Sequence, residues 1–169
     1  AQTEKYVGVT ISAHQFQFIK QYIFRFMEDN RELLARRVRE HRIRDGHGDL
    51  HLEHIVVADD IIIFDCIEFN ERFRYGDVAA EVAFLSMDLD FNGHPEYAER
   101  FVRGYAEHAA DAELLKLQNF YKCYYAYVRG KVVGFRSDDP AIDGRGREEA
   151  RKLAARYFDL AYTYAARLE

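Results

Sequence analysis

Two aspartates at the ends of short apolar segments constrain the fold of this chain more than any other feature. Asp49 follows a Gly-His-Gly sequence. Asp65, sixteen residues further along the chain, directly follows an apolar run. A second apolar run, residues 55–57, lies between them and is followed by the acidic pair 59–60. Because Asp is a common turn residue, this pair predicts a turn between two strands. We therefore expect residues 54–67 to form a β-hairpin that returns Asp65 to the neighbourhood of Asp49.

The composition limits the classes to which the chain can belong. Its 169 residues are 49% hydrophobic and 31% charged, which is typical of a folded protein, and we expect one domain over residues 1–169. The net charge of −5 argues against a nucleic-acid partner. No apolar run approaches the roughly 18 residues of a membrane span, so we expect no membrane partner. Cys66 and Cys123 show no metal or disulfide spacing, so we expect both to be reduced core residues of a cytoplasmic protein.

Apolar residues at helical spacing predict helices through most of the remaining sequence. The first is expected from Ala13 to about Asp29, with Thr10 or Ser12 as its N-cap, and a second follows with Leu33, Leu34 and Val38 facing inward. Its arginines are expected to face outward, namely Arg31, Arg36, Arg37, Arg39 and Arg42.

Capping and breaking residues place the later helices. Asp77 is expected to cap one helix, Pro95 to begin another that runs to about Ala110, and Asp111 to cap a long third one. A final helix is expected over residues 147–167, whereas residues 70–76 are expected to form a loop. The pattern therefore predicts a mostly α domain with one small β-hairpin.

Three motifs in order resemble the active-site signature of one enzyme family. They are His47-Gly48-Asp49 with His54 five residues after the Asp, Asp65 at a strand end, and the stretch Gly76-Asp77-Val78-Ala79-Ala80-Glu81. This set is similar to the aminoglycoside phosphotransferase and choline kinase-like branch of the protein-kinase fold. The residues at 44–51 and 65–70 resemble a little-characterised bacterial group of that branch, and the resemblance extends from about residue 30 to 135.

The resemblance implies that the chain is the helical C-terminal lobe of a protein-kinase-like α+β fold. The N-terminal lobe of such enzymes carries a glycine-rich loop and a strand lysine that hold the nucleotide. Only 46 residues precede His47, and most of them have a helical pattern, so we expect this lobe to be absent from the polypeptide. We expect the isolated chain to be inactive, and an uncovered apolar face to favour homo-oligomers.

The resemblance also implies an activity and roles for individual residues. The complete enzyme is expected to transfer the γ-phosphate of ATP to a hydroxyl of a small molecule, such as an aminoglycoside or a sugar. Asp49 would be the catalytic base, and Asp65 would bind Mg²⁺ or Mn²⁺. His47 would hold the loop through a backbone hydrogen bond, and Gly48 would supply an unusual backbone conformation. Glu81 would accept hydrogen bonds from the loop backbone, and no nucleotide-binding residue is identified.

His54 departs from the family pattern, which usually has Asn at this place as an oxygen ligand for a second metal ion. Imidazole suits zinc, copper, iron or nickel better than magnesium. His54 is therefore either a metal ligand, with a metal that differs from magnesium, or a structural residue. In the second case Glu53 or a water molecule would take its place at the metal.

Two other functions fit part of the same stretch. Asp49 and His51 resemble the Asp-x-His opening of metallophosphoesterases, although the later metal-binding motifs of that family are missing. Alternatively, the chain is a kinase-like binding module that has lost catalysis. Four further polar residues are expected to lie at the acceptor side or, preferably, on solvated surface, namely Glu68, Asn70, Asp88 and Asp90.

Overall fold

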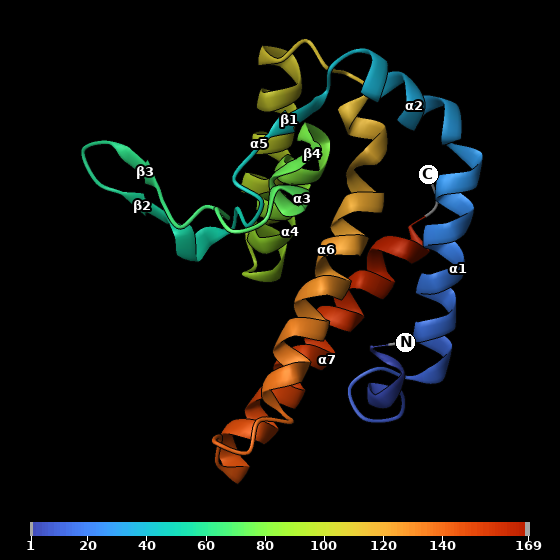
Figure 1. Cartoon of the computed structure of the whole chain (residues 1–169), viewed down its shortest axis with the longest axis vertical. Coiled ribbons are helices and arrows are strands. Elements are labelled where there is room, and N and C mark those ends of the chain that lie inside the picture. The colour runs from blue at the N-terminus through green and yellow to red at the C-terminus, as the bar shows by residue number, and fades with distance from the viewer. Residues whose placement is uncertain (1, 168–169) are drawn as a thin grey trace. The chain divides into compact units, whose positions relative to one another are not determined.

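The computed structural model describes residues 2–167, which are mostly helical (Figure 1). Within these residues the chain forms two compact units, residues 29–122 and residues 2–28 together with 123–167. The expectation of one domain over the whole chain stays a prediction. None of the helices in the described part is both long enough and apolar enough to cross a membrane.

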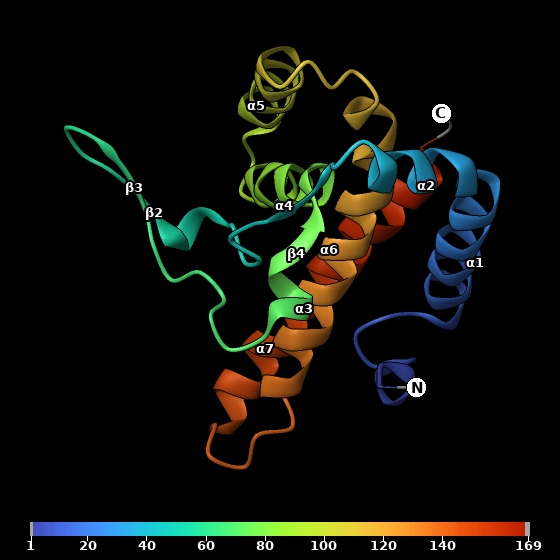
Figure 2. The ribbon, with the colours of Figure 1, turned by 45° about the horizontal axis from the view of Figure 1, so that its top comes forward.

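The unit of residues 29–122 holds all four strands of the described chain. It contains α2 (Arg31–Arg39), β1 (Ile43–Asp45), the 3₁₀ helix η2 (Leu52–His54), β2 (Ile55–Val57), β3 (Ile61–Ile63), α3 (Glu71–Arg74), β4 (Tyr75–Asp77), α4 (Val78–Phe91), α5 (Pro95–His108) and the beginning of α6 (Leu114–Arg136). The strands form two antiparallel pairs, β1 with β4 and β2 with β3. Both views show the β2–β3 hairpin extending away from α4 and α5 (Figures 1 and 2).

Helix α4 forms the apolar centre of this unit. It packs against α5, and nine of its residues are buried, from Ala79 to Asp88. A helix that is apolar on all sides belongs in a core. Asp77 caps it as expected, because its side chain accepts a hydrogen bond from the backbone N–H of Ala79. Helix α4 therefore begins directly after β4, and its first turn lies beside the loop that follows β1.

The unit of residues 2–28 and 123–167 is built from helices. It contains the 3₁₀ helix η1 (Glu4–Tyr6), α1 (Ala13–Asp29), the remainder of α6, and α7 (Gly144–Ala166). Ser12 caps α1, because its hydroxyl accepts from the backbone of Gln15 while the Gln15 side chain accepts from the backbone of Ser12. This reciprocal pair is a capping box, which the sequence indicated through Ser12.

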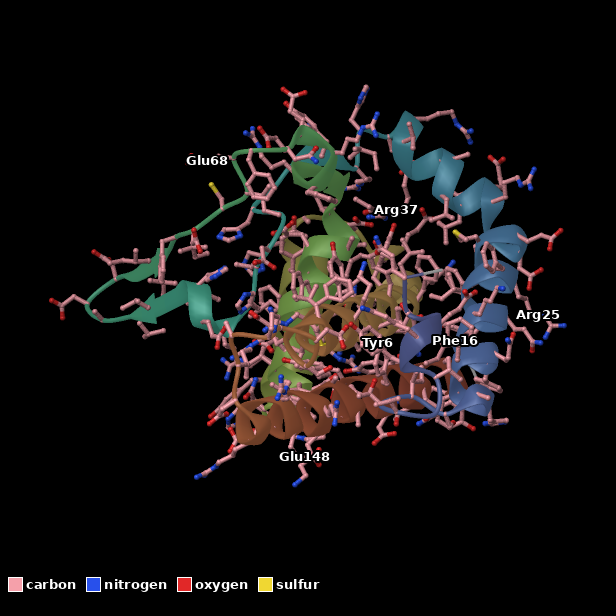
Figure 3. The ribbon with its side chains drawn as sticks, turned by 60° about the horizontal axis from the view of Figure 1, so that its bottom comes forward. Tyr6, Phe16, Arg25, Arg37, Glu68 and Glu148 are labelled. Atoms are coloured by element: carbon pink, nitrogen blue, oxygen red, sulfur yellow. The ribbon has the colours of Figure 1, made fainter. Side chains whose placement is uncertain are left out.

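Arg37 corrects the expectation that every arginine of α2 faces solvent. Its side chain, labelled in Figure 3, is 1% exposed and forms hydrogen bonds to the carboxylates of Asp77 and Asp111, with N···O distances of 2.6–2.9 Å. Burial disfavours the charged form of Asp111, but the hydrogen bonds and charge of Arg37 outweigh it and lower the pKa of Asp111. Val38, which we expected inside, is exposed. The two buried carboxylates therefore turn α2 so that Arg37 faces the core.

The pairing of β1 with β4 corrects the expectation that strands occur only between residues 54 and 67. Ile43 pairs with Asp77, and Asp45 pairs with Tyr75. The predicted loop at 70–76 instead contains α3 and most of β4. Both strands have three residues and carry polar side chains, so they lack the alternating pattern that marks a strand in sequence.

Candidate functional site

The loop after β1 requires glycine at position 48. Gly48 has a φ of 79°, and a Cβ atom built on it would lie 2.7 Å from the carbonyl oxygen of Phe73. Only glycine meets both the backbone conformation and the close approach without strain. The backbone N–H of Gly48 points to the first turn of α4, where both carboxylate oxygens of Glu81 lie 3.2 Å away. The loop is therefore fixed to the core helix.

Glu81 lies partly buried under this loop. Burial raises the pKa of its carboxyl group, and the N–H of Gly48 partly offsets the rise. Its position in the first turn of α4 also favours a negative charge, because backbone N–H groups there point out of the helix. The sequence-based expectation placed Glu81 on the loop backbone, and the structure has this contact.

His47 ties the loop to the segment that follows the hairpin. Its Nε2 donates to the carbonyl oxygen of Phe64 at 2.7 Å, while its Nδ1 accepts from the backbone N–H of Asp49 at 3.3 Å. This pair of contacts corresponds to the neutral tautomer with the proton on Nε2. The carbonyl oxygen of His47 also accepts from the N–H of Ile67 at 2.9 Å. The residues on both sides of Asp65 are thus held against the loop that carries Asp49.

Asp65 has a left-handed backbone conformation, with a φ of 62°. Asp tolerates this region better than most residues. The preceding N–H, from Phe64, donates to the carbonyl oxygen of His54 at 3.1 Å. The Asp65 side chain is 73% exposed and brings Oδ2 to 3.4 Å from Nε2 of His54.

His54 stands between the two aspartates that the sequence singled out. Its Nδ1 donates to the backbone carbonyl of Asp49 at 2.9 Å and lies 3.9 Å from the Oδ2 atom of that residue. Its Nε2 faces Asp65. One nitrogen of a single imidazole ring therefore faces each aspartate, and the hairpin does return Asp65 to the loop.

His51 adds a second imidazole to this arrangement. It is 3% exposed, its Nε2 lies 3.6 Å from Oδ2 of Asp49, and its ring centroid is 4.0 Å from that of His54. Donor atoms of Asp49, His51 and His54 lie within 4.8 Å of one another. Carboxylate and imidazole donors at such spacing suit a divalent ion.

A comparison of the sequence with models of known families gives one match. The family model described as "Phosphotransferase enzyme family" matches residues 12–116, which is more than half of the chain and includes every site residue described above. The chain belongs to the phosphotransferase enzyme family.

The relatives of this phosphotransferase family member are longer proteins. It is 32% identical over 162 residues to uncharacterised proteins of Mycobacterium bovis (strain ATCC BAA-935 / AF2122/97) and of Mycobacterium tuberculosis (strain ATCC 25618 / H37Rv). Each match covers 95% of this chain and 31% of the relative, so the chain spans about a third of the length of those proteins. No solved structure matches the chain.

Two residues near the candidate site differ from the sequence-based expectation. Asp88 is buried rather than solvated, and its carboxylate accepts from the backbone N–H of Leu52 at 2.9 Å, at the start of the short helix that carries His54. The signal was present, since Asp88 lies between the apolar residues Met87 and Leu89 of α4. Cys66 is exposed rather than in the core, whereas Cys123 is buried as expected.

The other polar candidates serve local structure or solvent. Asp90, expected on solvated surface, forms an ion pair with Lys122 at 2.9 Å, and both side chains are largely buried. Asn70 caps α3 by accepting from the backbone N–H of Arg72. Glu68, labelled in Figure 3, is exposed as expected. The structure brings together the six residues selected from sequence, namely His47, Gly48, Asp49, His54, Asp65 and Glu81.

Proposed function

We propose that this chain is the C-terminal helical lobe of an ATP-dependent small-molecule kinase with a protein-kinase-like fold. Family membership supports phosphotransfer as the reaction class. The observation that carries the proposal is the placement of His54, whose two ring nitrogens face Asp49 and Asp65. This arrangement supports the proposal that one carboxylate serves an acceptor and the other a metal ion.

Asp49 is the proposed catalytic base. Its backbone N–H is held by His47 and its carbonyl oxygen by His54, so the side chain is presented from a fixed backbone. The side chain is 37% exposed, which leaves it accessible to an acceptor hydroxyl. In phosphoryl transfer such a carboxylate orients the hydroxyl and accepts its proton as the phosphorus–oxygen bond forms.

Asp65 is the proposed metal ligand. Mg²⁺ or Mn²⁺ bound there with ATP would neutralise the charge that develops on the phosphate oxygens. An exposed carboxylate fits this task, because hard divalent ions prefer oxygen ligands. His54 does not fit the preference of Mg²⁺. The ATP-binding groups are proposed to lie in an N-terminal lobe outside this chain.

The acceptor is proposed to be a small hydroxyl compound such as an aminoglycoside or a sugar. This part rests on family resemblance, since a fold does not fix a substrate. We further propose a cytoplasmic protein without nucleic-acid or membrane partners, in which the isolated chain is inactive and can self-associate.

The test uses the longest native polypeptide that contains this chain. ADP release is measured with ATP and Mg²⁺ or Mn²⁺ over a panel of aminoglycosides, sugars and choline-like alcohols. Asp49→Asn is expected to lower kcat about 10²–10⁴-fold, because it removes the proposed base. Asp59→Asn, in the exposed turn of the hairpin, is the matched control and should leave kcat unchanged. Full turnover by Asp49→Asn would refute the proposal.

One observation favours a second function. The Asp49, His51 and His54 donors resemble part of a metallohydrolase site. Hydrolysis of bis-p-nitrophenyl phosphate with Mn²⁺ or Zn²⁺, without ATP consumption, would favour that alternative. Absence of both activities and of nucleotide binding would favour a kinase-like binding module.

A further inference from the structure

The hydrogen bonding of His54 determines which ring nitrogen is available to a ligand. Nδ1 donates its proton to the carbonyl oxygen of Asp49 at 2.9 Å. In the neutral ring Nε2 then carries a lone pair. Metal-binding histidines commonly donate their other ring N–H to a carbonyl or a carboxylate, which fixes the tautomer and the orientation of the ring. His54 has this arrangement.

The separation between His54 and Asp65 fits two ligands of one ion. Nε2 and Oδ2 are 3.4 Å apart, which is longer than the about 2.7–2.9 Å of a charge-assisted hydrogen bond. Two donors that each bind a tetrahedral ion at about 2.0–2.1 Å lie about 3.3–3.4 Å from each other. The distance therefore matches an edge of a coordination polyhedron better than a direct ion pair.

A second imidazole ring, that of His51, lies beside His54. The His51 ring is buried, with its Nε2 3.6 Å from Oδ2 of Asp49 and its Nδ1 3.7 Å from Oε2 of Glu53. Donors of Asp49, His51 and His54 lie within 4.8 Å of one another. The imidazole nitrogen of His54 beside the carboxylate of Asp65 differs from the oxygen-only shell that Mg²⁺ prefers.

We propose that this site selects a first-row transition ion of the Mn²⁺, Co²⁺ and Zn²⁺ class over Mg²⁺, with His54 Nε2 and Asp65 Oδ2 as ligands. Imidazole binds these ions better than it binds Mg²⁺, and among the first-row ions affinity generally rises from Mn²⁺ to Cu²⁺ and falls again at Zn²⁺. The inference rests on the proposed function for the role of Asp65 as a metal ligand. It deepens that function by naming the ion and by giving His54 a role in choosing it.

The test measures metal binding by this chain, independently of activity. Mn²⁺ is titrated into the protein, and free Mn²⁺ is followed by its electron paramagnetic resonance signal, first alone and then in competition with Mg²⁺. We expect a 100-fold excess of Mg²⁺ to displace less than half of the bound Mn²⁺. Bound Co²⁺ should give visible absorption bands whose position and intensity indicate a nitrogen ligand.

Two variants identify the ligands. His54→Asn exchanges imidazole for an amide oxygen and should lower the preference for Mn²⁺ over Mg²⁺ at least about tenfold. Asp65→Asn keeps a residue type that tolerates the left-handed backbone at this position, so it should leave the fold intact, and it should weaken Mn²⁺ binding at least about tenfold because it removes the charged carboxylate. His94→Asn, at an exposed histidine before α5, is the matched control and should change neither value.

The outcomes separate this inference from the proposed function. Equal affinity for Mn²⁺ and Mg²⁺, or unchanged selectivity in His54→Asn, would overturn the inference, while ADP release by the longer polypeptide would still support the kinase. Conversely, selective Mn²⁺ binding that requires His54 and Asp65 would support the inference. It would do so even if the longer polypeptide failed to consume ATP with any metal ion, which would overturn the kinase proposal alone.

Discussion

Two polar clusters in the unit of residues 29–122 differ in how closely their charged groups are paired and in how deeply they are buried. The buried arginine cluster consists of Arg37, Asp77 and Asp111. The histidine–aspartate cluster consists of Asp49, His51, His54 and Asp65. In the first, the hydrogen bonds measure 2.6–2.9 Å and every side chain is almost fully buried. In the second, the carboxylate–imidazole distances are 3.4–3.9 Å and the two aspartates reach solvent.

The difference separates structural from functional polarity. A buried charge is strongly destabilising unless it is paired, and Arg37 is the partner of both buried carboxylates. That cluster therefore needs nothing from outside the chain. In the other cluster both aspartates reach solvent, and His54 Nε2 and Asp65 Oδ2 lie at a distance that an ion can bridge.

Removal of Arg37 should have the largest effect on stability. Arg37→Ala removes the cation that pairs with Asp77 and leaves Asp111 with only Arg42, at 3.8 Å, and loss of one partner from a buried ion pair costs about 3–5 kcal/mol. Urea unfolding followed by circular dichroism measures the change. Arg39→Ala, at the exposed pair with Glu32, is the control and should cost at most about 1 kcal/mol. A loss no larger than the control would contradict the structural role of the cluster.

Gly48→Ala should be the next largest change and should act on the site loop. The left-handed conformation costs about 1–2 kcal/mol for a non-glycine residue, and the contact with the carbonyl oxygen of Phe73 adds about 1–3 kcal/mol. Gly93→Ala is a matched control, because Gly93 has a φ of 84° but open space around its Cβ position. Equal losses of unfolding free energy in the two variants would show that the close approach at Gly48 does not matter.

Acid should weaken the buried arginine cluster. The pKa of Asp111 is lowered from its ordinary value of 3.8, so its ionised form contributes stability above that value. The contribution is lost as the pH falls through the lowered pKa. Urea midpoints measured between pH 5 and pH 3 should therefore decrease less steeply in Asp111→Asn than in the native chain. The opposite order would contradict the assignment.

Glu81 should show the smallest effect, with the opposite sign. Burial raises its pKa above 4.5, so its contribution to stability is fully present below that value and is lost as the pH rises through the raised pKa. Glu81→Gln keeps an oxygen that can accept from Gly48 and removes the charge. Relative to this variant, the native chain should gain stability when the pH is lowered from neutral to about 4.5. Carboxyl chemical shifts measured against pH would locate the titration directly.

Local signals in the sequence predicted much of this structure. Caps at Ser12 and Asp77 and the break at Pro95 mark helix ends through contacts between close neighbours, and the structure has helices beginning at each of them. The turn after residue 57 likewise predicted the β2–β3 hairpin. The resemblance of three ordered motifs to a known family selected the residues that the site brings together.

Long-range partners were outside the reach of such signals. The burial of Arg37 depends on carboxylates 40 and 74 positions away, and a run of arginines does not indicate which one turns inward. The β1–β4 pair joins segments of three residues with no alternating pattern. For Asp88, the deciding contact is with the backbone N–H of Leu52, which begins the short helix η2 and lies 36 positions earlier in the chain.

The positions of the two cysteines give the native chain a chemical handle. The thiol of Cys123 is buried and burial raises its pKa to about 12, so it resists thiol reagents at neutral pH. Cys66 is exposed and follows Asp65 directly. A maleimide fluorophore will therefore attach at one position, beside the carboxylate proposed to bind the ion, and its emission can be used to follow ion binding without an engineered cysteine.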